Sequence, residues 1–314
     1  MGQFAFGQSV ARTEDPRLLT GRGNYVNDVN LHHQAHGFVL RSPHPHAKIL
    51  SIDTAEAKAA PGVIAVLTGA DIQAAGLGVT KVNFQHKRAD GSPLYSVPHP
   101  GLVTDRVRFV GDYVAFIVAK TVAQAKDAAE LVMVDYQPLE AITDTASAPE
   151  EGSPAVWDDC PDNISCIIHQ GDKDATDAAF EKADTMIKQR FVINRISANP
   201  MEMRGCVGIY DQREDRYIIY NDIQAPHALR QVLSEDIFKV PQKDVQVIAG
   251  NVGGAFGMKG PTYPEIRLCA WASKQIGLPV KWSCERSEAF QSDEHCRDNV
   301  SEAEMALTSD GKFL

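Results

Sequence analysis

The residues best suited to hold a ligand form a glycine-rich stretch, Gly-Asn-Val-Gly-Gly-Ala-Phe-Gly-Met-Lys-Gly, at positions 250–260. Apolar, β-favouring residues precede the stretch, and a helical pattern follows it. Glycines between a strand and a helix let backbone N–H groups approach a ligand closely, because no Cβ stands in the way. Phe256 is the one large aromatic residue among these small ones. The stretch therefore predicts a site where backbone amides bind one part of a ligand and a ring faces another.

Two common nucleotide-binding motifs do not fit this stretch. A dinucleotide fingerprint needs G-x-G-x-x-G, and Gly253, Gly254 and Gly257 do not have that spacing. A phosphate-binding P-loop needs G-x-x-x-x-G-K-[ST], but a glycine follows Lys259 and a methionine precedes it. The alternative is a tight turn in which the glycines bind nothing and are needed only because they can adopt its φ angles.

Composition and charge exclude several classes of protein. The chain has 314 residues, 44% hydrophobic and 23% charged, enough for two globular domains. Its net charge of −10 argues against a nucleic-acid partner. No apolar run is long enough to span a bilayer, and the first residues lack a signal-peptide pattern. We therefore expect a cytoplasmic protein with no transmembrane segment.

The cysteines and histidines form no recognised metal motif. None of the six cysteines is spaced C-x-x-C with another, so neither a zinc ribbon nor an iron–sulfur cluster is indicated, and free thiols are expected. The histidines that cluster in the sequence are His32, His33, His36, His44 and His46. They lack acidic or thiol partners at a metal-ligand spacing, so we interpret them as surface histidines, with a metal site as the alternative.

The first part of the chain alternates short strands and helices. The strand-like runs are 35–40, 63–67, 113–119 and 131–136. A short helix is expected at 54–60, and another opens at Thr121, where Gln124 would complete a capping box. This pattern predicts a compact α+β domain that ends near residue 140.

A second unit follows a segment rich in proline, serine and acidic residues. Its strand-like runs are 183–192, 207–221 with a polar turn inside, and 280–284. One helix opens at Pro226, and another around Ile266 stops at Gly277. Near the end, residues 303–314 read as a hairpin without most of its second arm, which predicts that the chain is the N-terminal part of a longer polypeptide.

Six segments together resemble one family. They are residues 10–25, 41–47, 61–71, 200–205 (Pro-Met-Glu-Met-Arg-Gly), 224–227 (Gln-Ala-Pro-His) and the glycine-rich stretch. In this order they resemble the molybdenum hydroxylases: xanthine dehydrogenase, aldehyde oxidase and the large subunit of aerobic carbon monoxide dehydrogenase. The form of the motifs is most similar to the carbon monoxide dehydrogenase large-chain branch. The resemblance implies an α/β hammerhead domain over 1–140, a linker over 141–164 and a truncated first molybdopterin-binding domain over 165–314.

The resemblance also implies the residues of a cofactor site. Those whose backbone would lie against the molybdenum–pterin centre are Gly253, Gly254, Ala255, Phe256 and Gly257. Phe256 would also help to hold a planar substrate. Gln224 matches the family glutamine that hydrogen-bonds an oxygen ligand on molybdenum, a role suited to an amide that donates or accepts without changing charge. No direct metal ligand is implied, and an ordinary glutamine at a strand end is the alternative. We interpret Glu202 and Arg204 as structural.

Arg297 falls where purine-oxidising relatives have a substrate-orienting arginine. Such a residue can stabilise negative charge that develops on a substrate. An ion pair of Arg297 with Asp298 or Glu294 is an equal alternative. Gly260 stands where purine hydroxylases have a glutamate, which argues against recognition of a purine-like substrate.

The resemblance implies an oxidoreductase that oxidises a small molecule, such as an aldehyde, an N-heterocycle or carbon monoxide, with oxygen from water. Its cofactor would be molybdopterin with molybdenum, with the cytosine dinucleotide form left open. FAD and [2Fe-2S] clusters would belong to an FAD-binding medium subunit and an iron–sulfur small subunit, in a dimer of heterotrimers. The family's catalytic glutamate would lie beyond Leu314, so the fragment alone would be inactive, with no catalytic residue of its own. A non-catalytic hammerhead-containing assembly or binding module is the alternative; a nucleotide-dependent oxidoreductase is disfavoured by the glycine spacing.

Overall fold

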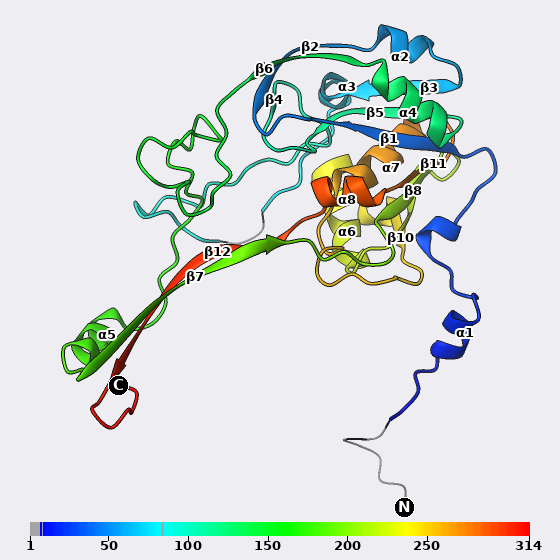
Figure 1. The fold of residues 1–314 in the computed structure, drawn as a ribbon. Coiled ribbons are helices and arrows are strands. Elements are labelled where there is room, and N and C mark those ends of the chain that lie inside the picture. Colours follow the sequence, from blue (N-terminus) through cyan, green and yellow to red (C-terminus); the bar gives the residue numbers. More distant parts are fainter. Residues whose placement is uncertain (1–6, 8, 83–84) are drawn as a thin grey trace, which may run out of the picture.

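The computed structural model describes residues 7, 9–82 and 85–314, and one mixed sheet of seven strands runs through it (Figure 1). Its order is β10-β9-β8-β11-β1-β5-β3. The strands are β1 (Ala35–Arg41), β3 (Val63–Thr68), β5 (Tyr113–Ala119), β8 (Gly205–Asp211), β9 (Arg216–Asn221), β10 (Val245–Ile248) and β11 (Val280–Ser283). Two neighbouring pairs are parallel, β1 with β11 and β9 with β10. The sheet therefore joins the N-terminal and C-terminal parts of the chain, and the mixed architecture confirms the predicted α+β class.

Strand β5 is buried along its whole length, as its apolar run predicts. Helix α4 (Val122–Glu130) packs on β5 and β1. The hydroxyl of Thr121 caps α4 by accepting a hydrogen bond from the Gln124 N–H at 3.2 Å. The reciprocal half of the expected capping box is not formed, because the Gln124 side chain packs over Gly62.

A three-stranded sheet of order β4-β2-β6 lies beside the main sheet. Its strands are β2 (Ala47–Asp53), β4 (Arg106–Val107) and β6 (Met133–Pro138). The helical segments of the N-terminal part are α1 (Asp15–Leu19), η1 (Val26–Asp28), which contacts β8, and the two helices that contact β3, α2 (Ala55–Ala59) and α3 (Gly69–Ala74). His46, just before β2, is buried, and its Nδ1–H donates to the Glu140 carbonyl at 2.8 Å. The interpretation as surface histidines is therefore wrong for His46, because this residue directly precedes the buried first residue of β2 and is buried with it.

The helices of the C-terminal part pack against the other end of the main sheet. They are α6 (Pro226–Gln231), η2 (Val232–Phe238), η3 (Gln242–Asp244), α7 (Pro264–Ile276) and α8 (Arg286–Ser292). Helix α7 packs on β8 and ends as predicted at Gly277, whose φ of 72° is left-handed and whose N–H donates to the Ser273 carbonyl at 2.9 Å. The helical segments α6 and η2, the latter a π-helix, connect β9 to β10.

A long antiparallel ribbon of β7 (Thr185–Ile196) and β12 (Cys296–Leu307) projects away from the main sheet (Figure 1). Helix α5 (Lys173–Phe180) lies at its far end. Large apolar side chains on the ribbon, including Ile187 and Phe191, are about half exposed. Beyond β12 the chain turns at residues 309–311 and forms only an isolated bridge to Phe313, as the hairpin pattern predicts.

The proline-rich segment 141–164 contains no named helix or strand in the structure, yet it is held by specific contacts. The side-chain amide of Asn163 donates to the carbonyls of Ala148 and Pro154 at 2.9 and 3.0 Å. The domain limits 1–140, 141–164 and 165–314 stay predictions. Among the described residues no helix has the length and apolar character that crossing a bilayer requires.

Candidate functional site

The glycine-rich stretch and Gln224 meet at one edge of the main sheet. Strands β9 and β10 are parallel neighbours, so their carboxyl ends lie side by side. Gln224 follows β9, and the glycine-rich stretch follows β10. The crevice outside the carboxyl ends of parallel strands is a common place for ligands to bind. The structure therefore brings together two parts of the predicted site that lie far apart in the sequence.

A backbone hydrogen bond ties these two parts to each other. The N–H of Gln224 donates to the carbonyl oxygen of Lys259 at 2.9 Å. The Gln224 side chain is exposed, and so it is free to reach a ligand above the sheet edge. This hydrogen bond fixes the position of the Gln224 backbone relative to the end of the glycine-rich stretch.

Gly253 is held by protein rather than left open to a ligand. Its N–H donates to Glu202 Oε2 at 2.6 Å, and its carbonyl accepts from the Glu202 N–H at 3.2 Å. A Cβ built on Gly253 would stand 2.6 Å from the Glu202 Cβ, so only glycine fits there. The sequence reasoning missed this pairing, since Glu202 lies about fifty residues earlier.

The next four residues have amides with no partner. Across the described part of the chain, the N–H groups of Gly254, Ala255, Phe256 and Gly257 donate no hydrogen bond; we call these four groups the unpaired amides. Gly254, Phe256 and Gly257 have positive φ angles of 99°, 53° and 88°. Such turns can form concave arrays of N–H groups that bind anions. The glycines are thus needed for the φ angles of the turn, and the same turn leaves backbone N–H donors available to a ligand.

The Phe256 side chain is an exposed ring on a strained backbone. Its exposed fraction is 71%, and its φ of 53° is a conformation that costs an L-residue with a Cβ about 1–2 kcal/mol. The ring lies beside Gly254, where a Cβ would come within 3.0 Å of it. A large exposed ring in a strained turn next to unpaired donors is a good candidate for contact with a ligand.

A buried ammonium group lies beneath the turn. The Lys259 side chain is only 1% exposed, and its Nζ contacts Glu202 Oε2 at 3.0 Å and Asp222 Oδ2 at 2.6 Å. Burial raises the pKa of Asp222 above its ordinary value, and the Lys259 ammonium opposes that rise. We call Lys259, Glu202 and Asp222 the Lys259 cluster.

A second buried network, centred on Arg204, connects the two parts of the chain. Arg204 pairs with Asp293 at 2.6 Å and with Glu265 at 3.0 Å. Arg41 of β1 also pairs with Glu265, at 2.7 Å. Burial alone would raise the pKa of Glu265, but Arg204 and Arg41 hold it below its ordinary value. These contacts fit the interpretation of Arg204 as structural.

Arg297 takes no part in these contacts. It stands near the start of β12 with an exposed side chain and a φ of 70°. Asp298 pairs with Arg195 at 2.5 Å, and within the described ranges Arg297 forms no ion pair with Asp298 or Glu294, so the ion-pair alternative is wrong for both carboxylates. Asp298 lies close to Arg195 because Arg195 is on β7, the strand that pairs with β12. No hydrogen bond or ion pair links Arg297 to the glycine-rich stretch within the described ranges.

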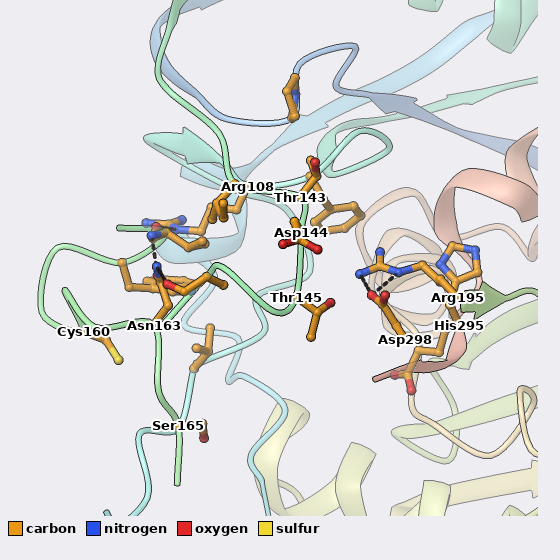
Figure 2. Close-up of a pocket in the computed structure, with 18 of the residues that line it drawn as sticks. Arg108, Thr143, Asp144, Thr145, Cys160, Asn163, Ser165, Arg195, His295 and Asp298 are labelled. Carbon is orange, nitrogen blue, oxygen red and sulfur yellow. Dashed lines mark hydrogen bonds and ion pairs between the residues drawn. The ribbon is translucent and has the colours of Figure 1, made fainter. Parts of the chain in front are cut away.

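A large cavity lies elsewhere, between segment 141–166 and the junction of α8 with β12 (Figure 2). Its volume is about 1330 Å³, above the usual range of a small-molecule pocket. Arg108 stacks on Trp157 at 3.5 Å on one side, and the Arg195–Asp298 pair stands on the other. Neither Gln224 nor any residue of 250–260 lines this cavity. No local motif indicated it, since its walls come from distant segments.

Two protein-family models together match most of the chain. Residues 20–140 match the family model for the aldehyde oxidase and xanthine dehydrogenase a/b hammerhead domain, and residues 156–314 match that for the molybdopterin cofactor-binding domain. The carbon monoxide dehydrogenase large chain of Afipia carboxidovorans is 37% identical over 96% of this chain and 38% of its own length. The nicotine 6-hydroxylase large subunit of Paenarthrobacter nicotinovorans is 35% identical over 98% of this chain and 36% of its own length.

Solved structures show the same architecture. Quinoline 2-oxidoreductase from Pseudomonas putida 86 superposes with a TM-score of 0.89 and 34% identity, covering 98% of this chain and 38% of that one. Carbon monoxide dehydrogenase from Oligotropha carboxidovorans gives a TM-score of 0.85 and 36% identity, with 98% and 38% coverage. The chain thus spans well under half the length of the relatives that it matches.

Proposed function

This chain belongs to the molybdenum hydroxylase family of xanthine dehydrogenase, aldehyde oxidase and the carbon monoxide dehydrogenase large chain, and we propose that it forms one wall of a molybdopterin site in an oxidoreductase. The observation that carries the proposal is the group of unpaired amides at 254–257, in a loop that is hydrogen-bonded to Gln224 at the carboxyl ends of β9 and β10.

The residues present fit a molybdopterin cofactor. The unpaired amides are donors without protein acceptors, and a pterin with its sulfur and phosphate groups is rich in acceptors. At Gly257 a Cβ would meet no atom within 4 Å, so the turn faces open space there. Gly253 stands apart from this set, because its N–H is taken by Glu202, and its proposed role is to shape the turn.

Each residue has a distinct part in the proposed site. The N–H groups of Gly254, Ala255, Phe256 and Gly257 would hold the cofactor edge without adding a titratable group. The Gln224 amide would hydrogen-bond an oxygen ligand of the metal and so orient it, since an amide both donates and accepts. The exposed ring of Phe256 would pack on a planar substrate.

When bound, molybdenum on its pterin supplies the two-electron oxidation of a small molecule with oxygen from water. The proposed substrates are an aldehyde, an N-heterocycle or carbon monoxide, in line with relatives named for nicotine, quinoline and carbon monoxide. Gly260 in place of a glutamate argues against a purine. Arg297 remains a proposed substrate-orienting residue, although among the described residues no hydrogen bond or ion pair connects it to the turn.

Further subunits belong to the same proposal. Relatives named as large subunits or large chains imply companion chains, and we propose an FAD-binding medium subunit and a [2Fe-2S] small subunit in a dimer of heterotrimers. The cytosine dinucleotide form of the cofactor is also a proposal. The six cysteines are all free, which favours the cytoplasm.

The test is a cofactor analysis of the full-length protein purified from its own host with the subunits that accompany it. The proposal predicts molybdenum and pterin in amounts close to that of the chain. Intact, folded protein that contains neither would favour the alternative, a non-catalytic hammerhead-containing assembly or binding module.

A further inference from the structure

We propose that Lys259 is a positioning residue that fixes the unpaired amides and Gln224 in a single arrangement, acting through Glu202 and Asp222. The inference rests on the proposed molybdopterin site for its functional meaning. Its structural part, the control of the turn by one buried ion cluster, can be tested without any cofactor.

The Lys259 ammonium joins two separate segments of the chain. Glu202 lies just before β8, and Asp222 lies just after β9. Both carboxylates contact the same Nζ, at 3.0 and 2.6 Å, and all three side chains are nearly or fully buried. A buried charge is stable only when it is paired, so the three groups hold one another in place.

The Glu202–Lys259 pair also closes the glycine-rich turn at its two ends. Glu202 Oε2 accepts from the Gly253 N–H at 2.6 Å and from Lys259 Nζ at 3.0 Å. One carboxylate oxygen therefore connects the residue before the unpaired amides to a residue after them. Residues 254–257 donate no hydrogen bonds within the described part of the chain, and inside the turn only the carbonyls of Ala255 and Gly257 accept, at 3.0 and 3.1 Å. The direction of the four N–H groups therefore depends in large part on how the two ends are held.

The backbone of Lys259 performs the third part of the positioning. Its carbonyl accepts from the Gln224 N–H at 2.9 Å, and Gln224 follows Asp222 by two positions. Lys259 thus contacts the Gln224 segment twice, through its carbonyl and through its ammonium. A shift of Lys259 would move the turn and Gln224 relative to each other.

The experiment compares Lys259→Met with the unaltered full-length protein by hydrogen–deuterium exchange and by pterin content. We expect exchange at the Gly253 amide to rise about tenfold, because the Glu202 carboxylate that accepts from it loses its buried cationic partner and is held less firmly. Exchange in β5, residues 113–119, should rise much less than at Gly253, and pterin per chain should fall several-fold. Lys126→Met is the matched control, since Lys126 is a partly exposed lysine paired with the exposed Glu285, and it should change neither the exchange rate nor the pterin content.

A second variant covers the case in which Lys259→Met does not fold. Glu202→Gln keeps an oxygen that can accept from Gly253 but removes the charge that Lys259 needs. It should give the same local rise in exchange, with a smaller loss of pterin. If Lys259→Met is insoluble, this variant decides the outcome.

Two results would overturn the inference: unchanged exchange over 250–260 with full pterin content, or an equal rise of exchange in β5, which would make the lysine a general stability residue. Failure of the proposed function would look different. The unaltered protein would then contain no pterin, while the exchange comparison would still report on the turn.

Discussion

The backbone N–H of Gln224 donates to the carbonyl oxygen of Lys259 at 2.9 Å, and this bond joins the loop after β9 to the loop after β10. The two residues are separated by a whole helical connection, α6 with η2. Their contact joins the loop that carries the Gln224 side-chain amide to the loop that carries the unpaired backbone amides. The proposed cofactor wall is built on this relationship.

Replacing Phe256 by alanine should affect substrate more than cofactor. The ring is 71% exposed, so its loss removes little packing within the protein. We expect pterin content and thermal stability to stay close to those of the unaltered protein, and KM for a bulky aromatic substrate to rise by about tenfold, the effect of losing one ring contact. Steady-state kinetics beside metal analysis checks this. Phe313→Ala, at another exposed ring, is the control, and equal loss of metal and turnover would instead mean that Phe256 is needed for folding.

Replacing Gly253 and Gly257 by alanine, one at a time, should show where the free energy of unfolding depends on close packing and where it depends on backbone conformation. At Gly253 the new Cβ would collide with Glu202, so we expect a loss of about 1–3 kcal/mol in the free energy of unfolding. At Gly257 the space is open and only the φ of 88° is unfavourable, so a loss of about 1–2 kcal/mol is expected. Gly311→Ala, with a φ of 81° and no neighbour, is the control and should match Gly257→Ala in stability. Urea denaturation measures all three. A milder effect at Gly253 than at Gly257 would contradict the packing found around Glu202.

Removing the charge of Arg204 should destabilise the fold strongly. Arg204→Met leaves Glu265 and Asp293 with one buried partner fewer, which for buried pairs costs about 3–5 kcal/mol. Arg297→Met is the matched control, because that arginine is exposed, and it should change stability by less than about 0.5 kcal/mol. Chemical denaturation compares the two. Similar stability of both variants would show that the Arg204 network contributes little.

The stability of the protein should fall in acid partly because of Glu265. Its pKa in the folded state lies below the ordinary 4.5, so the folded state favours the charged form. The contribution of Glu265 is therefore complete above about pH 4.5 and is lost as the pH falls through the lower folded value. Unfolding free energies measured between about pH 6 and pH 3 should decline less steeply for Glu265→Gln than for the unaltered protein, although the variant is less stable at neutral pH. Parallel curves would mean that other carboxylates cause the acid loss.

Local sequence patterns were sufficient for many elements of the fold. The all-apolar run of β5, the capping hydroxyl of Thr121 and the stop at Gly277 are each decided by neighbouring residues, and the structure confirms them. The parallel pairing of β1 with β11 could not be predicted in this way, because partners more than two hundred residues apart leave no periodic signal. The π-helical form of η2 could not be predicted from the sequence either, since the spacing of its apolar residues resembles that of an α-helix.

In the candidate site, too, local motifs could be predicted from the sequence, and contacts between distant segments could not. Gln224 and the glycine-rich stretch carry family motifs, so the sequence identified them. Lys259 was noted only for failing to complete a P-loop, and its burial between Glu202 and Asp222 appears only when three distant segments meet. Gly253 illustrates the limit, because its glycine was expected to admit a ligand and in the structure admits Glu202.

Cofactor analysis of the purified full-length protein tests the central claim most directly. Molybdenum would be measured by elemental analysis and pterin by its fluorescence after oxidative release, in unaltered protein and in Lys259→Met. In the unaltered protein we expect about one molybdenum and one pterin per chain, and in Lys259→Met several-fold less of both. Folded, unaltered protein from molybdate-supplied cells that contains neither molybdenum nor pterin would contradict it.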